Sequence, residues 1–295
     1  MKALSRLTHH VPSIIGLVVI VGFVLVAILA PWICSWLNID PYSQEILARF
    51  SPPDSLHLLG TDESGRDFLA RILFGARVSL GVALLSAAAS VLLGVLVGAL
   101  AGYYASWVDT LLMRLTDMLL ALPLLPVMIL LAALDFSKIP YLRVFVGDED
   151  TGVMKLIIIL VAFSWMTVAR LVRGQILKLR QLEFVAAAKS LGYGDLRIIV
   201  GHILPSVIPT VTVAVTLTVG QQILFESALS FLGLGIQPPL ASWGNMLNNA
   251  IETLRMAPTL VVIPGLLILF IVVSFNFLGD GLEYALDPKA DHHKN

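Results

Sequence analysis

Long runs of apolar residues alternate with short polar segments along this chain. Four runs carry no Asp, Glu, Lys or Arg and extend over residues 14–33, 78–108, 198–225 and 256–279. A hydrocarbon core about 30 Å thick needs roughly 20 apolar residues in a helix, and each run supplies them. We therefore expect these four segments to be transmembrane helices.

Two further segments are shorter or carry charge, and we interpret them as additional spans. In one of them, residues 152–173, Lys155 and Arg170 are placed to extend toward the lipid head groups. The expected spans are residues 14–34, 78–104, 113–134, 152–173, 204–228 and 257–279. This pattern predicts an all-α polytopic membrane protein with six transmembrane helices in a single domain, 1–295.

Composition supports a membrane location. Hydrophobic residues make up 58% of the chain and charged residues 13%, a balance typical of membrane proteins. The formal net charge of −1 provides no basic surface for nucleic acid. The single cysteine, Cys34, excludes an internal disulfide and a cysteine-based metal cluster. The adjacent His292 and His293 are interpreted as solvated residues, so no metal site is expected.

The positions of Lys and Arg predict the orientation. They gather between the fourth and fifth expected spans, at Arg170, Arg173, Lys178, Arg180, Lys189 and Arg197. They also flank the two termini, at Lys2, Arg6, Lys289 and Lys294. Positive residues favour the cytoplasmic side, so both termini are expected there and segments 37–77, 135–153 and 236–255 outside. The first apolar run is too long for a removable signal peptide and is interpreted as a span.

The segment between the fourth and fifth spans has the pattern of a short amphipathic helix, expected at 183–191. Four residues share one of its faces: Phe184, Ala187, Ala188 and Leu191. Gly192 follows where a helix ends on a left-handed residue, and Asp195 is placed to cap the next helix. From this periodicity alone, a helix lying on the membrane surface is an equal alternative to a helix that docks on a partner.

This segment also resembles the cytoplasmic coupling loop of ABC importer permeases, in which an E-A-A triplet, a Gly and a Leu-Pro pair keep fixed spacing. The matching residues are Ala186, Ala187, Ala188, Gly192, Leu204 and Pro205. The resemblance implies that they contact an ATPase, together with Glu183 and Phe184. Ala186 stands where the family has Glu, so we expect Glu183, one turn earlier, to provide the acidic contact.

Three further segments resemble the dipeptide, oligopeptide and nickel branch of that family. They are LGTDESGRDFLARILFGARVSL (59–80), LSFLGLGIQPPLASWGNML (229–247) and PGLLILFIVVSFNFLGDGLEYALDP (264–288). The resemblance implies a second homologous permease, two ATPases that hold ATP and Mg, an external solute-binding protein and a bacterial cell membrane. It implies short peptides as substrates, with nickel or another small solute as the alternative.

The first of these segments carries four charged residues expected at the outer surface: Asp62, Arg66, Asp67 and Arg71. Asp62 or Ser64 is placed to begin a collar helix, with Arg66 and Arg71 at the membrane interface. In the second segment, Pro238 and Pro239 predict a turn at the outer surface, with Trp243 at the interface. Both a structural role and contact with substrate agree with this pattern.

Small and polar residues inside two spans suggest helix packing or function. Gly94, Gly98 and Gly102 recur every four residues, which lets another helix approach closely. Gln222 and Glu226 share a face of the fifth expected span, and a carboxylate at that depth should face protein or a wet cavity. Glu226 is interpreted either as a residue bonded to a neighbouring helix or, with Gln222, as part of the translocation pathway.

The sequence contains no phosphate-binding loop, zinc-protease motif or serine-hydrolase motif. We therefore expect a permease subunit that is not an enzyme and has no cofactor of its own. An ion-gradient transporter or channel and an intramembrane enzyme are the alternatives from other classes. The acidic residues 148–150, in the expected loop 135–152, are interpreted as solvated or as a contact with the binding protein.

Overall fold

The computed structural model describes residues 10–138 and 151–286, and most of these residues are helical. The α-helices are α2 (Val11–Leu37), α3 (Phe68–Tyr104), α4 (Ser106–Leu120), α5 (Leu124–Ala133), α7 (Thr151–Leu179), α8 (Glu183–Ser190), α9 (Asp195–Ile198), α10 (Leu204–Phe231), α11 (Ala250–Met256) and α12 (Thr259–Leu286). A π-helical turn, Ile199–Ile203, joins α9 to α10. Residues 148–150, 292 and 293 lie outside the described part.

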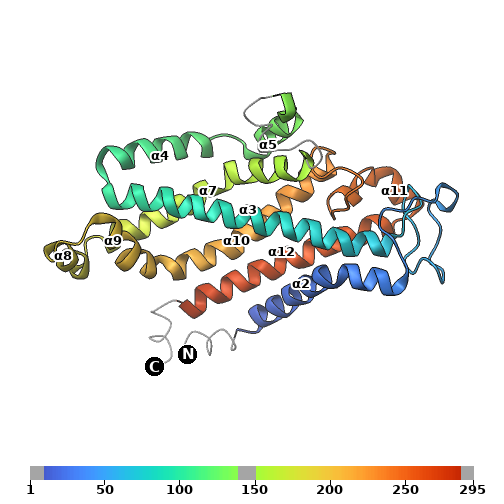
Figure 1. Ribbon diagram of the computed structural model, residues 1–295, viewed down its shortest axis with the longest axis horizontal. Coiled ribbons are helices and arrows are strands. Elements are labelled where there is room, and N and C mark those ends of the chain that lie inside the picture. Colours follow the sequence, from blue (N-terminus) through green and yellow to red (C-terminus); the bar gives the residue numbers. More distant parts are fainter. Residues whose placement is uncertain (1–9, 139–150, 287–295) are drawn as a thin grey trace.

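Five helices are long and apolar enough to cross a membrane: α2, α3, α7, α10 and α12. They correspond to five of the six expected spans. Figure 1 shows α8 and α9 at one end of the long axis, which we call the coupling end. Residues 38–67 and 232–258 lie at the opposite end, the loop end (Figure 1).

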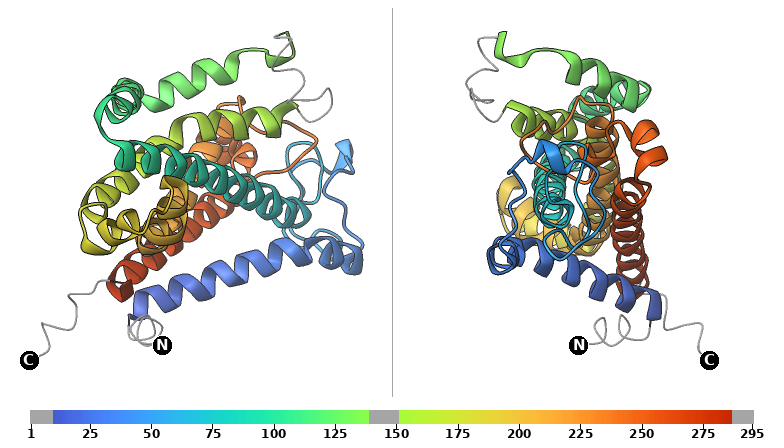
Figure 2. Two further views of the ribbon diagram at one scale, coloured as in Figure 1. Left: turned by 60° about the vertical axis from the view of Figure 1, so that its left-hand side comes forward. Right: turned by 90° about the vertical axis from the view of Figure 1, so that its right-hand side faces the viewer.

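The third expected span, 113–134, is not one continuous helix. Instead, α4 and α5 meet at a bend of 82°, a geometry that fits either one broken span or a re-entrant loop. Pro123 lacks an N–H group and disfavours helical backbone at Leu122, so the helix stops there. Figure 2 shows α4 and α5 on one side of the bundle, away from α2 and α12.

Helix α3 is the centre of the packing, and its glycines are the reason α7 approaches it closely. A Cβ added at Gly94 would lie 2.7 Å from the Trp165 carbonyl oxygen, and one at Gly98 would lie 2.5 Å from the Ala169 carbonyl oxygen. Gly102 meets α7 in the same way, one turn further on. The packing role expected for these glycines is confirmed, and the partner helix belongs to the same chain.

The first and last long helices pack against each other. A Cβ at Gly16 of α2 would lie 2.5 Å from the Ser274 carbonyl oxygen of α12. Nearer the helix ends, the Ser13 hydroxyl donates a hydrogen bond to the Phe277 carbonyl oxygen at 2.9 Å. The start of α2 and the end of α12 therefore lie side by side (Figure 1).

Candidate functional site

Helix α8 ends in a motif that fixes the direction of the chain after it. Gly192 has a φ of +79°, as predicted. The Gly192 N–H donates to the Lys189 carbonyl oxygen, and the Tyr193 N–H donates to that of Ala188. This pair of bonds is the Schellman arrangement, which needs a left-handed residue. No atom lies within 4 Å of a Cβ added at Gly192, so the requirement for glycine is conformational rather than steric.

The buried side of α8 differs in one residue from the side that the periodicity predicts. Val185 and Ala188 are buried against the rest of the chain. The expected docking face included Ala188, and this was wrong because helical spacing does not show which side packs inward. Phe184 is 40% exposed and Leu191 is 73% exposed, so an apolar surface remains free on α8.

The remaining coupling residues lie on or beside this free surface. Glu183, Ala186 and Ala187 are exposed on α8. Leu204 and Pro205 open α10, directly after the π-helical turn. Pro205 cannot donate a backbone hydrogen bond, and this accounts for an irregular turn at this point.

Tyr103, at the end of α3, holds the coupling segment in place. Its hydroxyl donates to Asp195 Oδ1 at 2.6 Å, and its carbonyl oxygen accepts from Arg180 Nη1 at 3.1 Å. The Lys189 ammonium lies 5.2 Å from the centre of the Tyr103 ring. Asp195 makes no capping bond to α9, so the expected cap was wrong. No local sequence signal marks Tyr103, because its partners lie about 80 to 90 residues away.

A second group of side chains joins the residues around α9 to the π-helical turn. The rings of Tyr193 and His202 are stacked with centres 5.7 Å apart. The Arg197 guanidinium lies 4.5 Å from the centre of the Tyr193 ring. Tyr193 follows Gly192 directly, so the left-handed turn and this stack together position the chain that leaves α8.

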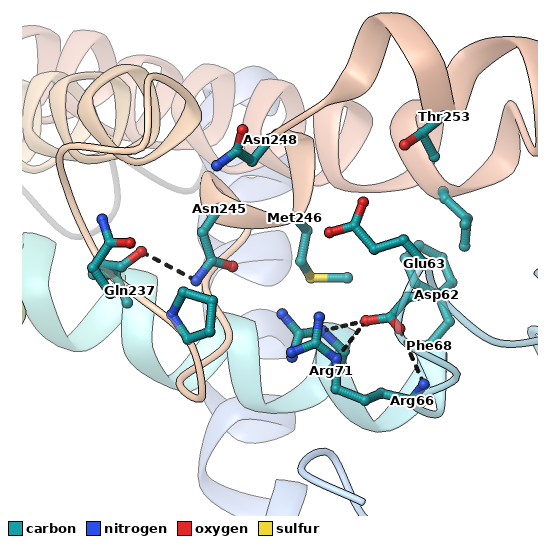
Figure 3. Close-up of a pocket in the computed structure, with 13 residues that line it drawn as sticks. Asp62, Glu63, Arg66, Phe68, Arg71, Gln237, Asn245, Met246, Asn248 and Thr253 are labelled. Atoms are coloured by element: carbon teal, nitrogen blue, oxygen red, sulfur yellow. Dashed lines mark hydrogen bonds and ion pairs between the residues drawn. The ribbon is translucent and has the colours of Figure 1, made fainter. Parts of the chain in front are cut away.

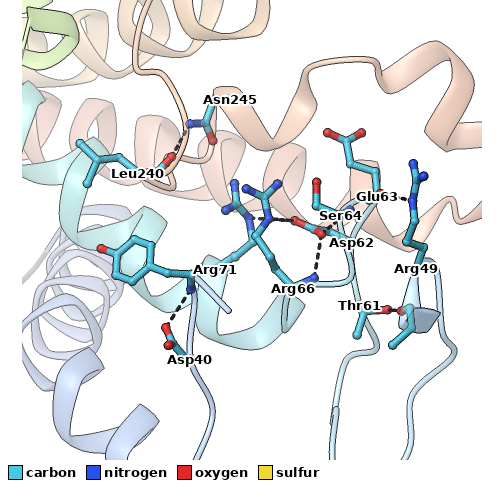
Figure 4. Close-up of polar contacts among 12 residues, drawn as sticks. Asp40, Arg49, Thr61, Asp62, Glu63, Ser64, Arg66, Arg71, Leu240 and Asn245 are labelled. Carbon is cyan, nitrogen blue, oxygen red and sulfur yellow. Dashed lines mark hydrogen bonds and ion pairs between the residues drawn. The ribbon is translucent and has the colours of Figure 1, made fainter. Parts of the chain in front are cut away.

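At the loop end, Asp62 links two buried arginines. Its Oδ2 lies 2.8 Å from Arg66 Nε and 3.1 Å from Arg71 Nε (Figure 4). Its Oδ1 accepts the backbone N–H groups of Ser64 and Arg66. Arg66 is 6% exposed and Arg71 4% exposed, so protein covers both side chains. Their expected depth at the membrane interface stays a prediction. One carboxylate that accepts from both arginines lets them lie inside the fold.

The collar helix expected to enter the second span is the start of α3 itself, which begins at Phe68, later than expected, and continues to Tyr104. Asp67, rather than Asp62 or Ser64, is the N-cap, and its Oδ1 accepts the Ala70 N–H at 2.8 Å. Its Oδ2 lies 2.9 Å from His57 Nδ1. Asp67 therefore begins α3 and also ties the preceding loop to it.

A pocket opens beside this cluster at the loop end. Its deep part contains Phe68 and the two buried arginines, and its exposed rim contains Gln237, Pro238 and Asn248 (Figure 3). Glu63 and Met246 line it between these two parts. The pocket thus combines the start of α3 with the loop that follows α10, two segments far apart in the sequence.

Trp243 joins the same loop to α3. It is fully buried inside the protein, and its expected depth at the membrane interface stays a prediction. Its Nε1 donates to the Ile72 carbonyl oxygen at 3.2 Å, and a Cβ added at Gly75 would lie 3.1 Å from its ring. The turn expected at 236–245 is confirmed up to residue 244, because a short 3-10 helix, Asn245–Leu247, begins at its last residue.

Glu226 is fully buried and connects three parts of the chain. Ser79 of α3 donates to its Oε2 at 3.1 Å, and Ser79 in turn accepts the Trp243 N–H at 3.1 Å. Ser230 donates to its Oε1 at 2.9 Å. These bonds account for a carboxylate at this depth. Gln222 is also fully buried. A role of the two residues on the translocation pathway stays a prediction.

Comparison with known families identifies the chain. The family model described as "Binding-protein-dependent transport system inner membrane component" matches residues 94–292. The chain belongs to this family of ABC importer permeases. A second model, the N-terminal transmembrane domain of oligopeptide transport permease C, matches residues 2–53. The resemblance stated from the coupling loop and the three further segments is confirmed.

Curated relatives match nearly the whole chain. A dipeptide transport system permease protein of Alkalihalophilus pseudofirmus is 36% identical over 98% of this chain and 89% of the relative. A glutathione transport system permease protein of Escherichia coli O157:H7 is 40% identical over 95% of this chain and 87% of the relative. A glutathione transport system permease protein of Pectobacterium atrosepticum is 38% identical over 80% of this chain and 74% of the relative.

Proposed function

We propose that this permease forms half of the translocation pathway for short peptides in an ATP-driven importer of a bacterial cell membrane. The other half is a second, homologous permease. Two ATPase subunits hold ATP and Mg, and an external solute-binding protein delivers the peptide. The observation that carries the proposal is the free apolar face of α8, held on Tyr103 in a chain whose relatives are named for dipeptides and glutathione.

The proposed mechanism uses movement rather than bond chemistry. The exposed face of α8, with Phe184, Ala187 and Leu191, receives an ATPase at the cytoplasmic side. Closure of the ATPases on ATP displaces α8, and the Tyr103 contacts pass this displacement to α3. Helix α3 reaches the loop end, where Trp243 packs on it. The coupling end is then cytoplasmic, and both termini lie on that side.

Copurification with nucleotide hydrolysis tests this proposal. The full chain, expressed with its neighbouring transport genes, should copurify with subunits that carry a phosphate-binding loop. ATP hydrolysis by the complex should rise when the binding protein and a dipeptide are added together. The proposal is contradicted if the chain purifies without an ATPase. It is also contradicted if the rate of ATP hydrolysis stays the same with every peptide that the binding protein supplies.

A further inference from the structure

The pocket at the loop end contains two buried arginines that share one close carboxylate. The side chains of Arg66 and Arg71 both pair with one carboxylate, that of Asp62, through their Nε atoms. Glu63, the other carboxylate that lines the pocket, acts on the charge of Arg71 but forms no ion pair with either arginine, so Asp62 is their one close carboxylate partner among the described residues. A buried charge is costly unless it is paired, so the cluster is electrostatically complementary to an added anion.

One nitrogen of this cluster also lacks a hydrogen-bond acceptor. Arg71 Nη1 is buried and has no partner among the described residues. Arg71 as a whole is 4% exposed and lines the pocket (Figure 3). An unsatisfied buried donor costs free energy that an acceptor would recover, and a planar guanidinium fits a carboxylate best. The deep part of the pocket is therefore built for a carboxylate ligand.

The opposite charge is present in the same pocket. Glu63 is half-buried, lines the pocket, and its carboxylate forms no ion pair in the part of the chain that the structure describes. Figure 3 shows it directed toward the side of the pocket formed by Met246 and Asn248. Asn248 is exposed at the rim, and its side-chain amide makes no hydrogen bond within the described residues.

We propose that this pocket is a binding site for a short zwitterionic peptide, with its carboxyl terminus on Arg71 and Arg66 and its ammonium group on Glu63. The choice of a peptide as ligand rests on the proposed function. An acidic side chain of a docking protein fits less well, because it satisfies the arginines but meets Glu63 with a like charge. A zwitterion satisfies both ends of the pocket.

Ligands that differ in one charge test the site on the unmodified chain. The purified full chain in lipid nanodiscs is titrated with L-alanyl-L-alanine, its C-terminal amide and its N-acetyl form, with binding followed by ligand-detected NMR. Each blocked peptide should bind at least about tenfold more weakly than the free dipeptide, because each loses one charge-assisted contact. Equal binding of the free dipeptide and its amide would overturn the site.

Variants assign the two charges to residues. Arg71→Gln should bind the free dipeptide and its amide equally. Arg77→Gln is the matched control, because Arg77 is exposed on the same helix and does not line the pocket. Glu63→Gln, at a half-buried position without an ion pair, should bind the free and N-acetyl dipeptides equally. Glu63→Gln alone tests the site if Arg71→Gln fails to fold. If Glu63→Gln still binds the free dipeptide more tightly than the N-acetyl form, the site is contradicted.

The outcomes for this pocket and for the proposed function are separable. Peptide uptake by the whole importer, with no dipeptide binding to the purified chain, would overturn the pocket and leave the function standing. Dipeptide binding that depends on Arg71 and Glu63, in an importer that takes up no peptide, would overturn the function. If Arg71→Gln loses only its association with the external binding protein, the assignment of the ligand as a peptide is wrong.

Discussion

Single residues at the coupling end have roles that their local contacts define. Gly192 supplies the left-handed backbone conformation that ends α8. Tyr103 contacts three side chains: its hydroxyl binds Asp195, its ring faces Lys189, and its carbonyl oxygen accepts from Arg180. Both residues act on the orientation of α8 and contribute no chemistry of their own. Their substitution should therefore change coupling more than folding.

Gly192→Val should reduce peptide-stimulated ATP hydrolysis and uptake. A β-branched residue at a φ of +79° costs roughly 1 kcal/mol or more, so the turn after α8 would shift. Gly194→Val is the control, because Gly194 has a φ of −68° and open space around it. Normal stimulated hydrolysis in Gly192→Val, measured in the reconstituted importer, would refute the coupling role of this turn.

Tyr103→Phe should uncouple hydrolysis from transport while the chain still folds. The change removes the bond to Asp195 and leaves its carboxylate without this donor, a loss of about 1 kcal/mol. The ratio of peptide transported to ATP hydrolysed measures the effect. Tyr104→Phe, at a half-exposed neighbour without a hydroxyl hydrogen bond, should keep the ratio of the unmodified importer. Equal ratios in both variants would contradict the role given to Tyr103.

At the scale of elements, α3 determines the arrangement of the bundle. Its glycines admit α7 between Trp165 and Ile176, and its first turns hold Trp243. Its 37 residues form one continuous helix of about 55 Å, at 1.5 Å per residue. A single rigid element therefore connects the coupling end to the loop end.

Gly98→Val should destabilise the chain strongly. The added Cβ would lie 2.5 Å from the Ala169 carbonyl oxygen, so α3 and α7 would have to separate. Such overpacking typically costs about 1–3 kcal/mol or more. Thermal unfolding in detergent, followed by size-exclusion chromatography, measures the loss. Gly81→Val on the same helix, with no atom within 4 Å of the added Cβ, should unfold near the temperature of the unmodified chain.

For the whole molecule, the decisive question is which end faces the cytoplasm. From the positive residues we predict that the coupling end lies inside, and that the pocket and the residues around Ser55 lie outside. The beginning of α2 and the end of α12 lie side by side toward the coupling end, so both helix ends share one side (Figure 1). Termini on one side require an even number of crossings, so we predict that the bent pair of α4 and α5 supplies the sixth.

Labelling of single cysteines tests this orientation. Ser55 and Ser190 are exposed at opposite ends of the molecule, whereas Cys34 is buried. In a Cys34→Ala background, Ser55→Cys should react with a membrane-impermeant thiol reagent in intact spheroplasts. Ser190→Cys should react only after lysis. Reaction of Ser190→Cys from outside would reverse the orientation.

The sequence by itself determined the class of protein, five of its long helices and the glycine turn at Gly192. These features are local: an apolar run or a left-handed residue is sufficient to predict them. The spacing of Gly94, Gly98 and Gly102 likewise predicted a close helix contact before its partner was known. The family followed from motifs with fixed spacing, and the comparisons agree.

Only the tertiary structure decided which side chains meet. Trp243 and Arg71 suit a membrane interface by composition, but contacts with segments distant in the sequence bury both. The same holds for Asp195, whose partner Tyr103 lies 92 residues away. Helical periodicity indicates which residues share a face but not what covers it. The inward side of α8 and the pocket at the loop end therefore became apparent only when the helices were packed.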